Sequence, residues 1–79
     1  MTSLYDSVVD VFVARFNVRR EKVQPDSSFG DLGLDSLSQI ELATALQKRL
    51  GVTITDDEIA NMSVVSDIVA RLEEKGVRA

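Results

Sequence analysis

The residue with the clearest chemical potential is Ser36, which directly follows Asp35 at the start of a long amphipathic segment. A serine in the first turn of a helix holds its hydroxyl at the positive end of the helix dipole, where backbone N–H groups favour an attached phosphate. The same position also suits an ordinary helix-opening serine beside a capping aspartate. The residues alone leave both interpretations open: a structural serine, or an exposed hydroxyl that becomes a phosphate ester.

Composition excludes several kinds of chemistry. The 79 residues include no histidine and no cysteine. Ser–His and Cys–His nucleophile pairs, imidazole and thiolate metal sites, and disulfide bonds are therefore impossible. We do not expect this chain to be an enzyme or to hold a metal ion.

The charge distribution bears on the kind of partner. The net charge of −4 disfavours nucleic acid, because phosphate binding needs a basic surface. Between Val23 and Gln47 there is no lysine or arginine, and the acidic residues are Asp26, Asp31, Asp35 and Glu41. This region would attract proteins with basic surfaces, although ordinary solubilising charge explains it equally well. No apolar run approaches the roughly 20 residues that span a bilayer, so we expect a soluble, cytoplasmic protein without membrane association.

The elements that must position these residues are predicted from apolar periodicity and capping residues. The first helix should begin near Ser3, because Ser3-x-x-Asp6 resembles a capping box, and should stop at Asn17. At about 100° per residue, one stripe of this helix contains Leu4, Tyr5, Val8, Val9, Phe12 and Phe16. The stripe predicts an amphipathic helix with its apolar face turned inward.

Residues 18–35 show no sustained period, and Pro25, Gly30 and Gly33 interrupt them. Apolar residues are nonetheless spaced through this segment, so we expect an ordered loop held over the core, with a short helical turn inside it. Three helices should follow: 36–50, capped by Asp35; a short one that Thr55 or Asp56 starts and that runs to residue 60; and 64–75, capped by Ser63. We expect residues 77–79 to be frayed.

Together these segments predict the all-α class. The expected architecture is a four-helix bundle of three longer helices and one short helix, with a long ordered loop between the first two. A chain of this length makes one domain, which we expect to span residues 1–79.

The second predicted helix has an unusual outer face. Counted from Ser36 at about 100° per residue, its core stripe contains Leu42, Ala43, Leu46 and Leu50. Leu37 points away from that stripe and Ile40 lies at its margin, so both share a face with Ser36. Two apolar residues beside one serine, with Asp35 and Glu41 at the rim, favour a docking surface; burial of both by the long loop is the alternative.

The segment Asp31-Leu32-Gly33-Leu34-Asp35-Ser36-Leu37 resembles the D-L-G-x-D-S-L motif of acyl carrier proteins. The resemblance covers essentially the whole chain and also rests on Pro25-Asp26-Ser27-Ser28-Phe29, Lys48-Arg49-Leu50-Gly51-Val52, Thr55-Asp56-Asp57-Glu58-Ile59 and Met62-Ser63-Val64-Val65-Ser66-Asp67. A lone D-S-L would recur by chance, whereas this spacing on a chain of this length is specific.

The resemblance implies that Ser36 is a modification site. In that family a phosphopantetheinyl transferase, with magnesium, transfers 4′-phosphopantetheine from coenzyme A to the serine hydroxyl. Asp35 is the residue that the resemblance assigns to contacts with the transferase and its magnesium. The thiol of the arm then holds acyl groups as thioesters, and this chain has no thiol of its own.

The resemblance also implies the partners. They would be the transferase, together with acyltransferase, ketosynthase and other synthase enzymes that have basic docking surfaces. The carrier itself is expected to be a monomer. The residues expected to meet these enzymes, on the second helix and at the start of the third, are Leu37, Ile40, Glu41, Thr44, Gln47, Asp56 and Asp57.

Departures from the family pattern bear on the pathway. Carriers of bacterial fatty acid synthesis tend to have an acid two residues after the serine, a methionine further along, and acids near the helix end. This chain has Ser38, Thr44 and Gln47-Lys48-Arg49 in those regions. The difference favours polyketide or other secondary-metabolite biosynthesis, with fatty acid synthesis, or an unmodified carrier-like interaction domain, as alternatives. Met1 and the short tail suggest a freestanding protein, although a domain excised from a megasynthase would look similar.

Overall fold

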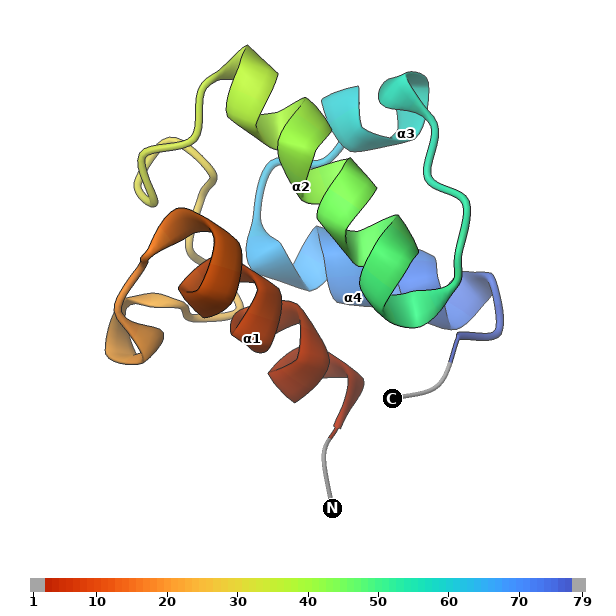
Figure 1. Ribbon diagram of the computed structural model, residues 1–79, viewed down its shortest axis with the longest axis horizontal. Coiled ribbons are helices and arrows are strands. Elements are labelled where there is room, and N and C mark those ends of the chain that lie inside the picture. Colours follow the sequence, from red (N-terminus) through yellow and green to blue (C-terminus); the bar gives the residue numbers. More distant parts are fainter. Residues whose placement is uncertain (1–2, 78–79) are drawn as a thin grey trace.

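The structure is a computed structural model that describes residues 3–77 and shows helices joined by loops (Figure 1). Its elements are α1 (Leu4–Phe16), the 3₁₀ turn η1 (Arg20–Lys22), α2 (Ser36–Leu50), α3 (Asp56–Ala60) and α4 (Val65–Glu74). Over the described residues, the only extended pairing is an isolated antiparallel bridge between Ser28 and Val64. The predicted all-α bundle of three longer helices and one short helix is confirmed.

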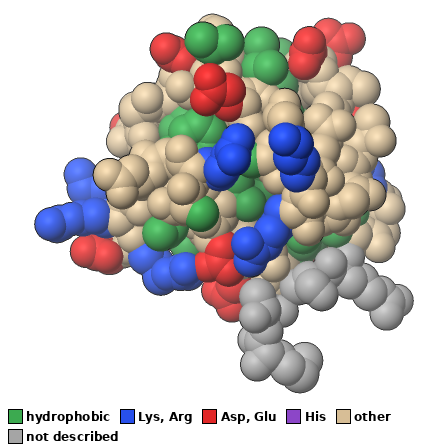
Figure 2. All heavy atoms as spheres, viewed as in Figure 1, with side chains coloured by type: hydrophobic (Ala, Val, Ile, Leu, Met, Phe, Trp, Pro, Cys, Tyr) green, Lys and Arg blue, Asp and Glu red, His purple; other side chains and the backbone are tan. Residues whose placement is uncertain are grey.

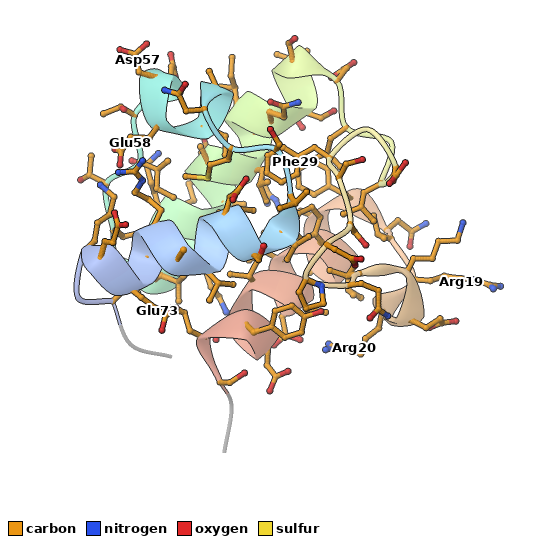
Figure 3. The ribbon with its side chains drawn as sticks, turned by 180° about the vertical axis from the view of Figure 1, so that it is seen from behind. Arg19, Arg20, Phe29, Asp57, Glu58 and Glu73 are labelled. Atoms are coloured by element: carbon orange, nitrogen blue, oxygen red, sulfur yellow. The ribbon has the colours of Figure 1, made fainter. Side chains whose placement is uncertain are left out.

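The helices form two layers. In Figure 1, α1 and α2 lie in front and run in roughly opposite directions, while α4 lies behind them. Figure 3 shows the same arrangement from the other side, with α4 in front. The short helix α3 packs beside α2, and α1 contacts both α2 and α4. In the described part of the chain, no helix reaches the length and apolar character that crossing a membrane requires.

The core is a cluster of mostly aliphatic side chains contributed by every helix and by the long loop. The largest fully shielded side chains are Val8, Phe12, Leu42, Leu46, Val65, Ile68 and Leu72. The apolar stripes predicted on the first and second helices therefore face inward. Val11 and Ala45, which lie outside those stripes, are buried as well, because α1 and α2 pack directly against each other.

Capping residues determine where the helices begin and end. Ser3 Oγ accepts the N–H of Asp6 at 3.1 Å, and the Asp6 carboxylate accepts the N–H of Ser3, which confirms the predicted capping box. A second box, between Thr55 and Glu58, opens α3. Gly51, with φ of 65°, ends α2 in the left-handed region that glycine adopts without steric cost.

The start of α4 corrects the prediction that Ser63 caps this helix. The helix begins at Val65, and Val64 occupies the N-cap position, where its side chain has no hydrogen-bond acceptor. The Asp67 carboxylate instead accepts the N–H groups of Ser63 (2.9 Å) and Val64 (3.2 Å). These two bonds hold the pKa of Asp67 below its ordinary value, and the bond from Ser63 has the larger effect. A carboxylate within the first turn thus replaces the expected serine cap.

The loop between α1 and α2 is joined to the start of α4 by backbone hydrogen bonds, which we call the loop–α4 seam. Its bonds run from Phe29 N–H to Ser63 O (3.0 Å), from Val65 N–H to Ser27 O (3.0 Å) and from Ser66 N–H to Pro25 O (2.9 Å). The N–H groups in the first turn of a helix have no acceptor within the helix itself. The seam supplies acceptors for two of these groups in α4 and fixes the loop at the same time.

The loop is ordered, as predicted, because its apolar side chains enter the core. Val23, Phe29 and Leu34 are buried, and Phe29 lies among the helices in Figure 3. The Tyr5 hydroxyl donates a hydrogen bond of 2.8 Å to the carbonyl of Val23 and so ties the loop to α1. The predicted short helical turn is η1.

The segment 77–79, expected to be frayed, lies partly within the described residues. The N–H of Val77 donates to the carbonyl of Leu72 at 3.0 Å, and its half-buried side chain packs against the core. The expectation is therefore wrong for Val77, while Arg78 and Ala79 lie outside the described residues.

Two leucines on opposite faces of α2 provide a matched test of this packing. Leu46→Ala should lower the free energy of unfolding by about 2–5 kcal/mol, because it opens a cavity in the core. Leu37→Ala removes the same atoms from an exposed position and should change that free energy by less than about 0.5 kcal/mol. Urea unfolding followed by circular dichroism measures both, and equal losses would place Leu37 in the core.

Asp67→Asn tests the α4 cap through pH. Because the pKa of Asp67 is lowered in the folded state, its charge stabilises the fold above the unfolded-state pKa of about 4. That stability is lost as the pH falls through the lower, folded-state pKa. The variant should therefore be less stable than wild type at neutral pH, and the difference should shrink in acid. Urea unfolding at a series of pH values measures the difference, and a pH-independent difference would contradict this origin.

Candidate functional site

The end of the long loop places Ser36 at the surface. Gly33 adopts φ of 80° in a turn that brings the Leu34 N–H to the carbonyl of Phe29 at 2.9 Å. The Leu34 side chain enters the core with only 6% of its surface exposed. Because α2 begins two residues later, Asp35 and Ser36 emerge on the outside, and both are exposed.

Asp35 caps α2, as predicted. Its Oδ1 accepts the N–H of Ser38 at 2.8 Å, and its carbonyl accepts the N–H of Gln39 at 3.0 Å. The hydrogen bonds from Ser38 are the main reason that the pKa of Asp35 lies below its ordinary value. A fixed carboxylate therefore stands beside the hydroxyl of Ser36, the first residue of the helix.

Ser36 fits a phosphate-bearing group. Its exposed position leaves room for a large substituent, and the first turn of a 15-residue helix presents the positive end of the helix dipole. A phosphate oxygen attached at this hydroxyl would lie in a field that favours negative charge. The negative charge of Asp35 opposes that field in part, because the same first turn already binds one anion.

Leu37 and Ile40 form an exposed apolar pair next to this serine. Their exposed fractions are 65% and 44%, and over residues 3–77 they are the large hydrophobic side chains most open to solvent. The long loop does not cover them, so the alternative in which it buries both is wrong. Thr44, one turn further on, is also exposed, and its hydroxyl donates to the carbonyl of Ile40 at 3.2 Å.

Acidic residues stand around the apolar pair. Glu41 on α2 is exposed, as are Asp56 and Asp57 at the start of α3, which packs beside α2. Figure 2 shows Asp and Glu side chains around hydrophobic surface at one end of the molecule, and Asp57 points outward in Figure 3. Gln47 is half-buried, and it lies about 16 Å along the helix axis from Ser36. It is therefore at the margin of this surface.

One residue that positions the acidic surface was not predicted to do so. The Glu58 carboxylate accepts a hydrogen bond from the Lys75 ammonium at 2.8 Å and lies 3.8 Å from the Nε of Arg71. Glu58 therefore links α3 to α4. The bond from Lys75 is the main cause of the lowered pKa of Glu58, followed by the bond from the Thr55 N–H. The spacing Thr55-x-x-Glu58 signals the capping box, but it does not reveal the partners Arg71 on α4 and Lys75 directly after it.

Comparison with known proteins identifies the family. The family described as "Phosphopantetheine attachment site" matches residues 6–72. The acyl carrier protein of Wolinella succinogenes is 36% identical over 72 residues, which cover 90% of this chain and 95% of that protein. The acyl carrier protein of a Sulfurovum species is 38% identical, covering 90% of this chain and 96% of its own length. That of Bdellovibrio bacteriovorus is 33% identical, covering 94% and 96%. These matches show that the chain belongs to the acyl carrier protein family, whose members hold acyl groups on covalently attached 4′-phosphopantetheine and are carriers rather than catalysts.

Proposed function

We propose that residues 1–79 act as one carrier domain in which Ser36 receives the phosphopantetheine arm. The observation that carries this proposal is the exposed hydroxyl at the first residue of α2, beside the Asp35 cap. When bound, the arm supplies a terminal thiol on which acyl groups are held as thioesters. The chain has no cysteine, so a loaded intermediate meets no competing thiol on its own carrier.

The chain's own residues have limited roles in this scheme. The start of α2 holds Ser36 outside the core and offers its phosphodiester the positive end of the helix dipole. The hydrogen bonds from Ser38 lower the pKa of Asp35, and an exposed carboxylate suits a contact with a magnesium ion of the transferase. The family resemblance assigns the base that deprotonates the Ser36 hydroxyl to the transferase, which fits a chain without histidine or cysteine.

Partner enzymes would recognise the surface around Ser36, which we call the acidic docking face. Its members are Leu37, Ile40, Glu41, Thr44, Asp56 and Asp57, with Gln47 at the margin. The apolar pair would supply the contact area, and the acids would steer basic surfaces of the transferase, an acyltransferase or a ketosynthase. The family relationship supports transferase and synthase enzymes as the general class of partner.

The composition of α2 supports polyketide or related biosynthesis as the pathway. Ser38 lies in its first turn and Thr44 in its middle, and Lys48 and Arg49 are exposed near its end, where the fatty acid type tends to be acidic. Fatty acid synthesis is the second candidate, favoured by the extent of the match to proteins named acyl carrier protein. We further propose that the carrier is monomeric and acts in the cytoplasm, as its sequence predicts.

Modification of Ser36 is tested with matched serine variants. The wild-type protein, incubated with coenzyme A, magnesium and a broad-specificity phosphopantetheinyl transferase, should gain the mass of one phosphopantetheine. It should also gain one thiol, which a thiol reagent can count because the unmodified chain contains no cysteine. Ser36→Ala should gain neither, whereas Ser38→Ala, altered two residues away, should gain both. A wild-type chain that remains unmodified would instead support the unmodified interaction domain.

The acidic docking face is tested by reversing one charge. Glu41→Lys should slow loading of the modified carrier by an acyltransferase, because it places a cation where a basic partner docks. The effect should be largest at low ionic strength, since salt screens exposed charges. Glu73→Lys makes the same charge change at an exposed position on α4 and should leave the loading rate unchanged (Figure 3). Equal rates for the two variants at every salt concentration would refute electrostatic docking at Glu41.

A further inference from the structure

A second surface, separate from Ser36, lies where α1 packs against α2. A shallow groove of about 230 Å³ runs between the two helices near the end of α2. We call it the basic groove, and it is lined by Val11, Ala14, Arg15, Ala45, Lys48 and Arg49. Figure 2 shows Lys and Arg side chains gathered over the middle of this face, with hydrophobic surface between them.

The floor and the rim of the groove differ in character. Val11 and Ala45 form a buried apolar floor, and the small side chain of Ala14 keeps the groove open. The three remaining lining residues are cations, so the rim is positive although the whole chain carries a charge of −4. The groove therefore offers an apolar strip bordered by positive charge.

The cations of the rim differ in their partners. Arg49 donates to Asp10 at 3.2 Å, and Asp10 also pairs with Arg20 of η1, which holds Arg49 at the edge of the groove. Among the ion pairs within residues 3–77, none involves Arg15 or Lys48. Both are exposed. Their charges remain available to a partner.

The groove is well separated from the carrier site. Ala45 and Arg49 lie nine and thirteen residues after Ser36 on the same straight element. At about 1.5 Å per residue, the groove therefore begins roughly 14 Å from Ser36 along the axis of α2 and ends roughly 20 Å from it. A partner held in the groove would leave the N-terminal turn of α2 accessible.

We propose that the basic groove binds an acidic amphipathic helix of a partner protein, so that one protein holds the carrier while another acts at Ser36. An apolar stripe on such a helix fits the floor, and Glu or Asp residues beside the stripe match Arg15 and Lys48. Three basic residues are fewer than the four to eight that typically bind anionic lipid surfaces. Two copies of a chain with charge −4 repel each other, which disfavours a second copy as the occupant.

The test uses a defined probe. A synthetic helical peptide of about four turns carries Leu residues in one stripe with Glu on both sides, and a control peptide has every Glu replaced by Gln. Amide NMR shifts of the carrier should change around Ala14 and Ala45 with the Glu peptide and remain constant around Leu37. Calorimetry should show binding that weakens with salt. Equal binding of the Gln peptide, or shifts centred on Leu37, would overturn the proposal.

Matched charge variants sharpen the test. Arg15→Gln with Lys48→Gln should weaken binding of the Glu peptide by about tenfold. Arg19→Gln with Lys22→Gln removes the same charge from exposed residues outside the groove and should leave binding within about twofold. Ala14→Glu, which places a carboxylate in the groove, should abolish binding. Thermal unfolding confirms that each variant is folded.

Other occupants give different outcomes in the same set of proteins. Sedimentation that reports a dimer of wild type, lost in the Arg15/Lys48 variant, would overturn the proposal in favour of a second copy. Binding to vesicles of anionic lipid, lost in the same variant, would overturn it in favour of a membrane surface. All of these measurements use the unmodified chain, so their results are independent of whether Ser36 is modified.

Discussion

The loop–α4 seam is the interaction on which the exposed position of Ser36 depends. A loop of nearly twenty residues costs much conformational entropy to order, and its buried side chains act together with backbone hydrogen bonds to a fixed edge. The first turn of α4 provides that edge, because its N–H groups need acceptors and the carbonyls of Pro25 and Ser27 supply them. With the loop fixed, Phe29 and Leu34 enter the core, and Ser36 must emerge two residues after Leu34. The position of the serine is therefore set jointly by the loop before it and by the start of α4, which is distant in the sequence.

The charged residues near the two ends of α2 stabilise the helix and also set the sign of the charge on its surface. Asp35 stands at the positive end of the helix dipole, and Lys48 and Arg49 stand at the negative end, so each charge stabilises the helix where it lies. The same arrangement divides the surface of one helix into an acidic end near Ser36 and a basic end against α1. A charged partner attracted to one end would be repelled by the other, so the charges that stabilise the two ends of α2 would also set the position of the proposed docking along it.

Local rules predicted most of the fold. The bounds of α2 follow from Asp35 and Gly51, and the exposure of Leu37 and Ile40 follows from the 3.6-residue period. The same rules failed where the decisive partner is distant in sequence. Ser63 is a good capping residue by type, but Asp67 and the loop carbonyls satisfy the start of α4. The burial of Val11 and Ala45 and the bond between Glu58 and Lys75 likewise depend on which helices meet, which periodicity alone does not specify.

The stability of the isolated domain does not explain the exposed apolar pair beside Ser36. Burying a leucine or isoleucine side chain contributes about 1.5–3 kcal/mol, a sizeable amount for a domain of 79 residues. The loop passes close enough to place Leu34 in the core, yet it leaves Leu37 at 65% exposure three residues later. Polar residues there would serve an isolated domain better, because they would lower its tendency to associate. In the docking proposed above, the apolar pair would be buried in each complex with a partner enzyme, a burial that is absent in the free chain.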